Sequence, residues 1–350
     1  MGSVTPLLAI KQGLDTEGRG DYMWIGTANG PEKDIVTKNG IVFKSIPSGK
    51  LRRYFDWKNF IDPLWIMLGF LKSLWIVWRF RPDVILTAGS FVSVPLVFAA
   101  SLFKIRVVIH QQDLKIGLAN RLMQRVACKI TVAFDDLRDY FPREKVVITG
   151  NPVRPEIFNG DKQRAFAKFN LEVNLPVLLI MGGGVGSEII NKVFIENNKE
   201  ITEFCQVIHV LGKGEQSKWL VNPETNGNTR YHLYDFLDAD LPDAYAVADL
   251  FFGRAGFSTL TELAAISKPA VIMPIPNHQQ VENAEFFHAQ KAIVYVRQED
   301  FQGEYIANLL RDLLEKTGRL NELSVNIHNS MPEDATQEYV RFVNDLIRKY

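Results

Sequence analysis

The stretch VLLIMGGGVGSE, residues 177–188, decides the fold: a fully apolar run enters a glycine-rich turn, and a helical segment begins at about Glu188. A run without polar alternation is typical of a strand that is covered on both faces, as in a parallel sheet. Glycines let the backbone turn tightly between such a strand and the helix that follows. The stretch therefore predicts one strand–turn–helix unit of a doubly wound α/β domain.

Other apolar runs of strand length alternate with helical segments along the chain, which favours parallel sheets covered by helices. The runs are residues 22–25, 41–46, 84–87, 106–110, 129–133, 146–149, 177–181, 206–211, 231–234, 250–252, 270–273 and 292–295. They form two series that join near Gly150–Phe158, so we expect two doubly wound, Rossmann-like domains. We expect an N-terminal domain over 1–152, a C-terminal domain over 153–330, and a last helix over 331–350 that packs back toward the N-terminal domain.

Composition excludes several classes of protein. The 350 residues are 47% hydrophobic and 23% charged, as in ordinary globular proteins, so disorder, collagen-like repeats and coiled coil are excluded as the main architecture. The two cysteines, Cys128 and Cys205, lack CxxC spacing, which excludes a disulfide framework and argues against a zinc site. A reducing cytoplasm fits this cysteine usage.

The net charge of zero hides an uneven distribution. Residues 1–154 carry 22 Lys and Arg against 13 Asp and Glu, a net of +9, and the remainder carries 18 against 27, a net of −9. A basic half can face phosphates, nucleic acid or anionic lipid, although a chance distribution of solvated charge is the alternative. No helix-turn-helix, OB or RRM pattern is present, so we expect no nucleic-acid partner.

The start of the chain departs from the doubly wound pattern. Residues 6–14 predict a helix, but no strand precedes them and no signal-peptide pattern is present. Such a domain normally opens with a strand and a glycine-rich turn before this helix. Either the sequence begins inside that turn, or the domain lacks its first strand. We expect the loss of a central strand to leave sheet edges unpaired.

One apolar stretch points to a membrane surface. Residues 64–78 are 15 residues long and include Lys72, so we expect no spanning helix, which needs about 20 apolar residues. The membrane-facing candidates are Trp65, Leu68, Trp75 and Trp78, and the basic residues in and around the stretch are Lys50, Arg52, Arg53, Lys58, Lys72, Arg79 and Arg81. Tryptophans beside cations suit the headgroup layer of an anionic membrane. A helix buried against a sheet is the alternative, and both can hold on different faces.

A second glycine turn follows the run at 250–252 and reads Gly253-Arg254-Ala255-Gly256 before a helical segment. Like the turn at 182–186, it could present free N–H groups to a phosphate, although a tight turn without a ligand is as good a reading. Glu262 lies further along this helix, where a carboxylate can accept two hydrogen bonds from a ribose diol. On spacing alone, an exposed helical glutamate is the favoured interpretation.

A third motif follows the run at 270–273 and includes His278, Gln279, Gln280 and Asn283. Loops at the carboxyl ends of parallel strands are where doubly wound sheets bind ligands. The amides of Gln279, Gln280 and Asn283 offer donors and acceptors that suit sugar hydroxyls. A lone histidine such as His278 is more often a polar loop residue than a base.

Together these motifs resemble the MurG family of GT-B glycosyltransferases, and the likeness extends over almost the whole chain. Four further segments at the same relative places carry it: 24–27, 48–53, 150–154 and 212–216. The resemblance implies a GT-B fold, two Rossmann-like domains with a cleft between them. It implies inverting transfer of N-acetylglucosamine from UDP-N-acetylglucosamine to the C4 hydroxyl of undecaprenyl-diphosphate-muramoyl pentapeptide, in peptidoglycan synthesis. It also implies a peripheral enzyme on the cytoplasmic face of the cell membrane, whose acceptor binds the N-terminal domain.

The resemblance also implies a donor site without metal or other cofactor. No DxD motif accompanies the donor motifs, and in such folds the leaving diphosphate can be stabilised by helix N-termini and by cationic side chains. Its members are Arg154, Gly183, Gly184, Gly186, Phe236, Leu237, Arg254, Ala255, Gly256, Glu262, Gln279, Gln280 and Asn283. In this assignment Glu262 binds the ribose, Gln279 and Gln280 bind the sugar hydroxyls, and Phe236 and Leu237 line the uracil.

The acceptor side departs from the family pattern. The family's first loop ends in a histidine proposed as general base, and Ser3 stands at that place here. Serine cannot replace an imidazole near pH 7. By motif position the candidate bases are His110 and Asp113, although both could merely position the acceptor. Two alternatives stay open: a truncated or non-catalytic homologue that binds UDP-sugar, and another GT-B lipid glycosyltransferase.

Overall fold

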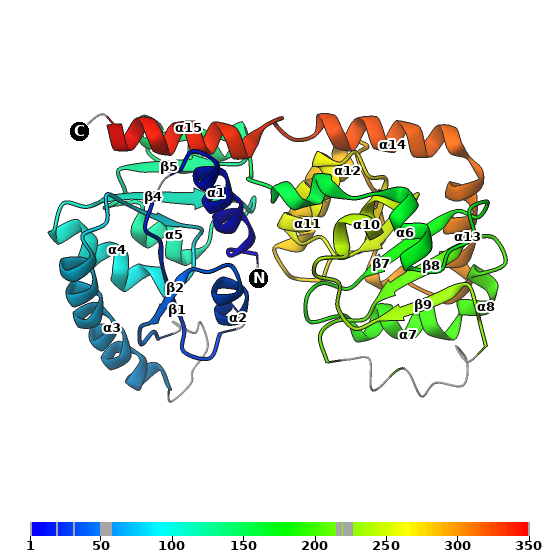
Figure 1. The fold of residues 1–350 in the computed structure, drawn as a ribbon, viewed down its shortest axis with the longest axis horizontal. Coiled ribbons are helices and arrows are strands. Elements are labelled where there is room, and N and C mark those ends of the chain that lie inside the picture. Colours follow the sequence, from blue (N-terminus) through cyan, green and yellow to red (C-terminus); the bar gives the residue numbers. More distant parts are fainter. Residues whose placement is uncertain are drawn as a thin grey trace. The chain divides into compact units, whose positions relative to one another are not determined.

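The computed structural model describes residues 2–18, 20–30, 32–49, 58–214, 219 and 227–348, with side chains from residue 62 onward in the segment that begins at 58. The chain divides into two compact units (Figure 1). The first unit comprises Met1–Arg154 together with Pro332–Tyr350, and the second comprises Pro155–Met331. The last helix of the chain thus belongs to the first unit.

The first unit contains parallel strands in two separate sheets. Its strands are β1 (Met23–Gly26), β2 (Val42–Ser45), β3 (Val84–Thr87), β4 (Arg106–Gln111), β5 (Lys129–Val132) and β6 (Val146–Ile148). Its α-helices are α1 (Thr5–Thr16), α2 (Glu32–Lys38), α3 (Lys58–Phe80), α4 (Ser93–Leu102), α5 (Leu118–Met123) and α15 (Ala335–Arg348), and its 3-10 helices are Asp135–Tyr140 and Arg143–Lys145. One sheet has the order β3-β4-β5-β6, and β1 pairs with β2 in the other.

The second unit contains one parallel sheet of six strands in the order β12-β11-β10-β7-β8-β9. Its strands are β7 (Val177–Met181), β8 (Gln206–Val210), β9 (Tyr231–Tyr234), β10 (Leu250–Gly253), β11 (Ala270–Ile272) and β12 (Val294–Tyr295). Its α-helices are α6 (Lys162–Lys168), α7 (Glu188–Glu196), α8 (Asn198–Ile201), α10 (Leu241–Val247), α11 (Phe257–Ala265), α12 (Gln280–Ala289), α13 (Gly303–Glu315) and α14 (Thr317–Asn329), and its 3-10 helices are Pro155–Asn159 and Gln298–Asp300.

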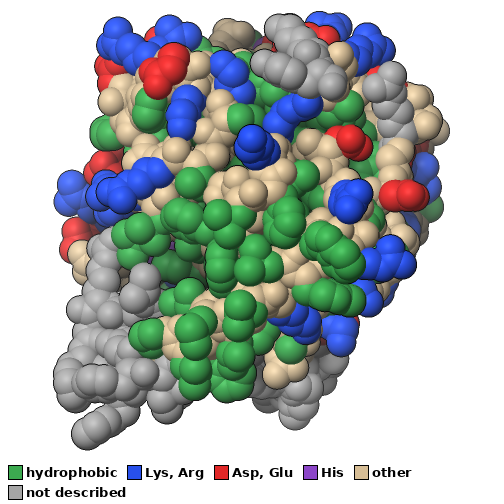
Figure 2. Space-filling view, turned by 90° about the vertical axis from the view of Figure 1, so that its left-hand side faces the viewer, with side chains coloured by type: hydrophobic (Ala, Val, Ile, Leu, Met, Phe, Trp, Pro, Cys, Tyr) green, Lys and Arg blue, Asp and Glu red, His purple; other side chains and the backbone are tan. Residues whose placement is uncertain are grey.

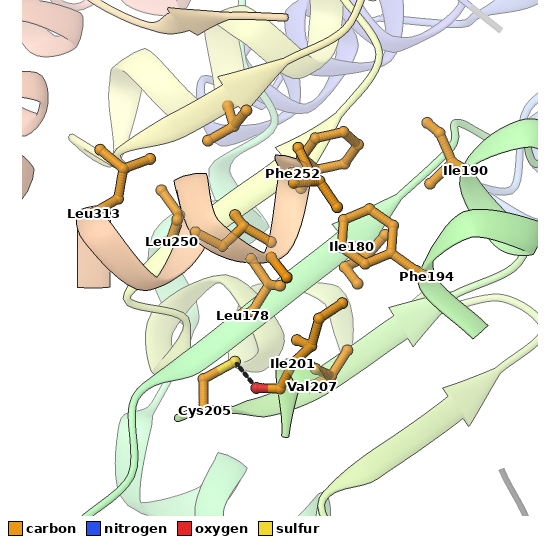
Figure 3. Packing of buried hydrophobic residues seen from close by; sticks show 14 of the residues in the cluster. Leu178, Ile180, Ile190, Phe194, Ile201, Cys205, Val207, Leu250, Phe252 and Leu313 are labelled. Carbon is orange, nitrogen blue, oxygen red and sulfur yellow. Dashed lines mark hydrogen bonds between the residues drawn. The ribbon is translucent and has the colours of Figure 1, made fainter. Parts of the chain in front are cut away.

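The core of the second unit explains why its strands are apolar throughout (Figure 3). Leu178 and Ile180 of β7 are fully buried in one cluster with Phe194 of α7 and Phe252 of β10. The rings of Phe194 and Phe252 lie 4.8 Å apart between centroids, edge to face, and Phe301 stacks on Phe252 at 5.4 Å. Helices cover both faces of this sheet, so a polar residue on either face would lose its water without gaining a partner. The predicted parallel α/β architecture is confirmed.

In the first unit, α1 is held by α15. Ile10 and Leu14 of α1 are buried in one cluster with Tyr339 and Val343 of α15. Gly13 faces α15 so closely that an added Cβ atom would lie 2.6 Å from a methyl group of Val340. A larger residue at position 13 would therefore push the two helices apart.

Helix α3 corrects the expectation from the 15-residue stretch. It runs for 23 residues with Pro63 inside it. Its segment Asp62–Phe80 has 19 residues and a mean hydropathy of 1.2, enough by length and composition alone to cross a membrane. The helix is thus longer than the 15-residue apolar stretch on which the expectation of no spanning helix rested. A core helix of a soluble protein passes the same test, and 22% of this segment is buried.

The two faces of α3 differ. Ser73, Ile76 and Val77 are buried, and α3 packs against α4. The opposite face exposes large apolar side chains: Leu64, Trp65, Met67, Leu68, Leu71, Trp75 and Trp78. Figure 2 shows hydrophobic side chains gathered on this side of the protein with lysines and arginines around them. The basic residues 50–53 lie outside the described residues, as does the side chain of Lys58.

Candidate functional site

Three of the predicted motifs lie at one edge of the six-stranded sheet. Strand β10 pairs with β7 on one side and with β11 on the other, and all three run parallel. The loops that follow them are residues 182–187, 254–256 and 273–279. Because parallel strands end at the same edge, the three loops are neighbours, as in the ligand-binding crevice of doubly wound sheets.

The turn after β7 requires its glycines. Gly183 and Gly186 have φ angles of +100° and +76°, in the region that side chains rarely adopt. The Gly186 N–H donates to the Gly183 carbonyl at 3.0 Å, which closes the turn. A Cβ atom on Gly186 would lie 2.0 Å from the Leu211 carbonyl oxygen, whereas one on Gly183 would meet nothing within 4 Å. Gly183 and Gly184 thus present bare backbone to any ligand above the turn.

Arg254 ties the three loops together. Its guanidinium donates to the carbonyl oxygens of Met273 and Pro274 at 3.2 Å each and to the Ser187 hydroxyl at 3.0 Å. The side chain is 8% exposed, and its buried Nε has no hydrogen-bond partner among the described residues. Burial lowers the pKa of this guanidinium from its ordinary value. A buried cation whose protein partners are neutral is suited to an anionic ligand.

Two helices begin at these loops. Ser187 precedes α7 and Gly256 precedes α11, and neither residue caps its helix with a side-chain hydrogen bond. The first N–H groups of both helices carry the positive end of the helix dipole. Ala255, between Arg254 and Gly256, is fully buried. The two turns therefore offer backbone donors next to a fixed positive charge, which is the arrangement that binds phosphates.

Glu262 is buried, which overturns the interpretation of an exposed helical glutamate. It is 5% exposed on α11, and the Tyr245 hydroxyl of α10 donates to its carboxylate at 3.3 Å. Sequence reasoning missed Tyr245, because nothing in the sequence connects α10 to this helix. Ser187 was missed as well, although a serine between a glycine turn and a helix is a recognisable N-cap signal.

The loop after β11 is organised by its own amides. Gln280 accepts a hydrogen bond from the Ile275 N–H at 3.1 Å, and its N–H donates to His278 Nδ1 at 3.3 Å. Asn283 is fully buried and donates to the Ala255 carbonyl at 3.3 Å, which connects this loop to the turn after β10. Gln279 is half-buried, and His278 is exposed.

Phe236 and Leu237 follow β9 at the far side of the same sheet edge. Phe236 is 42% exposed and Leu237 is buried. Asp235 joins this loop to the one after β8, because it accepts from the N–H groups of Gly212 at 3.0 Å and Gly214 at 2.9 Å. Arg154, the last residue of the first unit's N-terminal segment, is half-buried. Residues 215 and 216 of the motif at 212–216 lie outside the described residues.

Comparison with known proteins assigns the family. The glycosyltransferase family 28 N-terminal domain matches residues 1–132, and the C-terminal domain of that family matches residues 177–339. A UDP-N-acetylglucosamine–N-acetylmuramyl-(pentapeptide) pyrophosphoryl-undecaprenol N-acetylglucosamine transferase from Bacillus cereus is 35% identical and aligns over 97% of this chain and 92% of its own. The enzyme of that name from Clostridium perfringens is 39% identical over 89% and 87%. The chain belongs to this family of N-acetylglucosaminyltransferases.

Solved structures confirm the predicted fold, that of GT-B glycosyltransferases with two Rossmann-like domains. MurG from Acinetobacter baumannii matches with a TM-score of 0.72 at 24% identity and covers 99% of this chain and 96% of its own. A UDP-GlcNAc 2-epimerase from Neisseria meningitidis, solved with UDP-GlcNAc bound, matches with a TM-score of 0.70 at 14% identity, covering 99% and 98%.

Of the two candidate bases of this transferase, His110 is enclosed in the core. It lies inside β4, as the predicted run 106–110 implies, and it is fully buried. Its Nδ1 bonds with the Thr131 hydroxyl at 3.0 Å, and its Nε2 bonds with Asn151 Oδ1 at 2.9 Å. Burial lowers the pKa of His110 to about 4. Both ring nitrogens are occupied inside the core, so His110 cannot reach a substrate hydroxyl in this structure.

Asp113 lies on the loop after β4 and is half-buried. Its carbonyl accepts from the Gln111 amide at 2.6 Å. The neighbouring Gln112 is 7% exposed, and its Nε2 would lie 3.2 Å from a Cβ atom on Gly2. The N-terminal turn of this transferase therefore sits beside the loop that carries Asp113, and Asp113, unlike His110, is partly exposed.

The burial of His110 predicts a pH-dependent stability. Unfolded histidine titrates near pH 6.5, whereas folded His110 takes up a proton only near pH 4. The contribution of His110 to the free energy of unfolding is therefore fully present above pH 6.5 and is lost as the pH falls below this value. From pH 7 to pH 5 we expect His110 to contribute a loss of about 2 kcal/mol in the free energy of unfolding. Urea unfolding followed by tryptophan fluorescence at the two pH values measures it.

The matched control for this prediction is His110→Gln, which keeps a hydrogen-bonding side chain and removes the titration. The parent should lose about 2 kcal/mol more than the variant between the two pH values. Equal losses in the two proteins would show that His110 does not titrate in this way.

Proposed function

We propose that this chain transfers N-acetylglucosamine from UDP-N-acetylglucosamine to the C4 hydroxyl of undecaprenyl-diphosphate-muramoyl pentapeptide, the step from lipid I to lipid II in peptidoglycan synthesis. The relatives named above support the donor and the acceptor. The observation that carries the proposal is Arg254, a buried cation held between two glycine turns at the carboxyl edge of the sheet.

The diphosphate of the donor binds between these turns. The donors that face it are the Arg254 guanidinium and the backbone N–H groups at Gly183, Gly184 and Gly256. Charge develops on the leaving UDP as the glycosidic bond breaks, and donors that are already oriented stabilise this charge without reorganising. The site therefore needs no metal ion to activate the leaving group.

The uridine and the sugar bind at the flanking loops. The Glu262 carboxylate accepts from the ribose hydroxyls, and the Tyr245 hydroxyl holds it in place. Phe236 and Leu237 line the uracil after β9, and the amides of Gln279 and Gln280 face the N-acetylglucosamine hydroxyls. The buried Asn283 holds this loop to the turn after β10. Arg154 remains a donor-binding candidate from its motif at 150–154 alone. Glu262 sets the preference for ribose, because a 2′-deoxyribose would leave one carboxylate bond unmade.

The reaction inverts the anomeric centre in one displacement. The acceptor C4 oxygen forms a bond to the donor C1 as the bond from C1 to the diphosphate oxygen breaks, and UDP leaves. The acceptor proton passes to a general base, for which Asp113 is the candidate on the first unit. A carboxylate in a desolvated site can have its pKa raised toward the range that this role needs.

The acceptor is reached at the membrane surface, where the exposed face of α3 rests on the cytoplasmic leaflet. Trp65, Leu68, Trp75 and Trp78 enter the headgroup layer, and the surrounding cations attract anionic lipid. Gly69 supports a surface helix rather than a spanning one. A Cβ atom there would lie 2.1 Å from the Pro47 carbonyl oxygen, so α3 is seated closely on its own unit.

A second candidate function is binding of UDP-sugar without turnover. Two observations favour it: Ser3 stands at the family's histidine position, and His110 is buried. Neither position therefore offers an accessible imidazole that could act as general base. Another GT-B lipid glycosyltransferase would share the donor site and differ in its acceptor. Turnover with lipid I and radiolabelled UDP-N-acetylglucosamine separates these functions.

We expect Glu262→Gln to weaken UDP binding by about 1.5–3 kcal/mol, because the ribose hydroxyls lose their charged acceptor. Isothermal titration calorimetry with UDP measures the change. Glu196→Gln, at the far end of α7, is the matched control and should bind like the parent. The ribose assignment fails if both variants bind UDP with parental affinity.

We expect Asp113→Asn to lower kcat by about 100-fold or more and to remove the acid limb of the pH profile, since the amide cannot take up a proton. Turnover between pH 5 and 9 measures both. Asp139→Asn controls for loss of an exposed carboxylate in the same unit, and it should keep the parental profile. A parental profile in Asp113→Asn would rule out this base.

We expect the protein to sediment with anionic vesicles, with binding that weakens as salt rises. Trp75→Ser together with Trp78→Ser should reduce binding, whereas Tyr305→Ser, an exposed aromatic of the second unit, should not. Alkaline carbonate should release the bound protein. Equal binding to neutral vesicles would contradict the attraction between the basic residues and anionic lipid. Protein that stays bound in carbonate would contradict the position of α3 on the membrane surface.

A further inference from the structure

Ser187 stands at the join between the glycine turn after β7 and helix α7. Its backbone is extended, with φ −145° and ψ 108°, and its carbonyl accepts the first intrahelical hydrogen bond, from the Asn191 N–H at 2.9 Å. These features define an N-cap residue, whose hydroxyl ordinarily accepts a hydrogen bond from a helix N–H. The Ser187 hydroxyl makes no such bond, so capping does not account for this side chain.

The Ser187 hydroxyl contacts Arg254 instead. The Arg254 Nη2 donates to the Ser187 Oγ at 3.0 Å, and its Nη1 donates to two carbonyl oxygens of the loop after β11. A hydroxyl has one hydrogen to donate, besides the lone pairs with which it accepts. Since the Ser187 oxygen accepts from a cation, its own hydrogen points away from Arg254. Among the described residues this hydrogen has no acceptor.

The position of Ser187 is fixed from both sides. A Cβ atom on Gly182 would lie 2.5 Å from the Ser187 backbone nitrogen and 2.8 Å from its Cβ, so the turn folds Ser187 tightly against a glycine. On the helix side, the Asn191 amide donates to the Leu211 carbonyl at 3.0 Å, and its Oδ1 bonds with His209 Nε2 at 3.1 Å. Asn191 and His209 are fully buried, so this network holds the first turn of α7 on the sheet.

We propose that the Ser187 hydroxyl donates its hydrogen to a non-bridging phosphate oxygen of the donor nucleotide, which makes Ser187 a further binding residue for the diphosphate. The proposal rests on the donor site of the proposed function. The hydroxyl, the Arg254 guanidinium and the N–H groups at the start of α7 then act on one ligand. Arg254 independently points to an anion, because it is 8% exposed and its buried Nε has no partner among the described residues.

The contact with Arg254 makes the hydroxyl a stronger donor. Hydrogen bonds in a chain polarise one another, so a hydroxyl whose oxygen accepts from a cation has a more positive hydrogen. A hydrogen bond to a charged acceptor contributes more free energy than one between neutral groups. Uridine has no phosphate, so the effect of Ser187 on affinity should appear with UDP and be absent with uridine.

The test compares UDP and uridine binding to the whole chain by isothermal titration calorimetry. We expect Ser187→Ala to weaken UDP binding by about ten-fold or more and to leave uridine binding unchanged. Ser187→Thr keeps a hydroxyl on an extended backbone that β-branched residues adopt readily, so it should bind UDP with close to parental affinity. Circular dichroism checks that each variant folds.

Ser324→Ala is the matched control and should bind UDP like the parent. Ser324 lies on α14, is half-buried like Ser187, and its hydroxyl donates to the Ser267 carbonyl at 2.6 Å. The control therefore removes a half-buried serine hydroxyl from the same unit without touching the glycine turns.

A second comparison separates a direct contact from an effect through Arg254. In an Arg254→Ala background, a direct hydrogen bond predicts that Ser187→Ala still weakens UDP binding, whereas a serine that merely holds the guanidinium predicts no further loss. Three results would each overturn the proposal: parental UDP affinity in Ser187→Ala, an equal loss of uridine affinity, or no further loss in the Arg254→Ala background.

The proposal and the proposed function fail in different ways. UDP binding that depends on Ser187, without turnover, would contradict the transferase and support the phosphate contact. Turnover with parental UDP affinity in Ser187→Ala would support the transferase and overturn the contact. A parent that does not bind UDP would overturn both.

Discussion

The structure depends on one constraint: a parallel sheet covered on both faces admits no polar side chain without a partner along most of its length. The strands of the second unit satisfy it with runs such as VLLIM in β7, packed against Phe194 and Phe252. Polar functional side chains consequently lie at the strand ends, where the chain turns and backbone groups are not paired in the sheet. Arg254 shows the result, because it is buried at that edge and bonds to the loops after β7 and β11.

How far the sequence predicts this structure follows from the range of each interaction. Strands and glycine turns are local, and all twelve predicted runs overlap strands. The burial of Glu262 could not be predicted, since it depends on Tyr245, which precedes it by 17 residues on another helix. The enclosure of His110 could not be predicted either, since its ring bonds with Asn151, which follows it by 41 residues. The length of α3 was underestimated because charged and polar residues at its start still form helix.

The two units share a parallel α/β architecture but differ in whether the sheet is continuous among the described residues. In the second unit a complete sheet fixes the loops, and Arg254 locks them to one another before any ligand arrives. In the first unit the sheet is divided, and the loop that carries Asp113 contacts an N-terminal turn that starts directly before α1. A complete sheet in the second unit and an interrupted sheet in the first, among the described residues, are therefore separate properties of one chain.

The return of α15 to the first unit has a consequence for biosynthesis. Ile10 and Leu14 pack with Tyr339 and Val343, so this cluster joins residues that leave the ribosome more than three hundred positions apart. The second unit lies wholly between them and can fold while α15 is still untranslated. The unit that is synthesised first is thus completed last, because its core needs α15, which emerges only after the second unit.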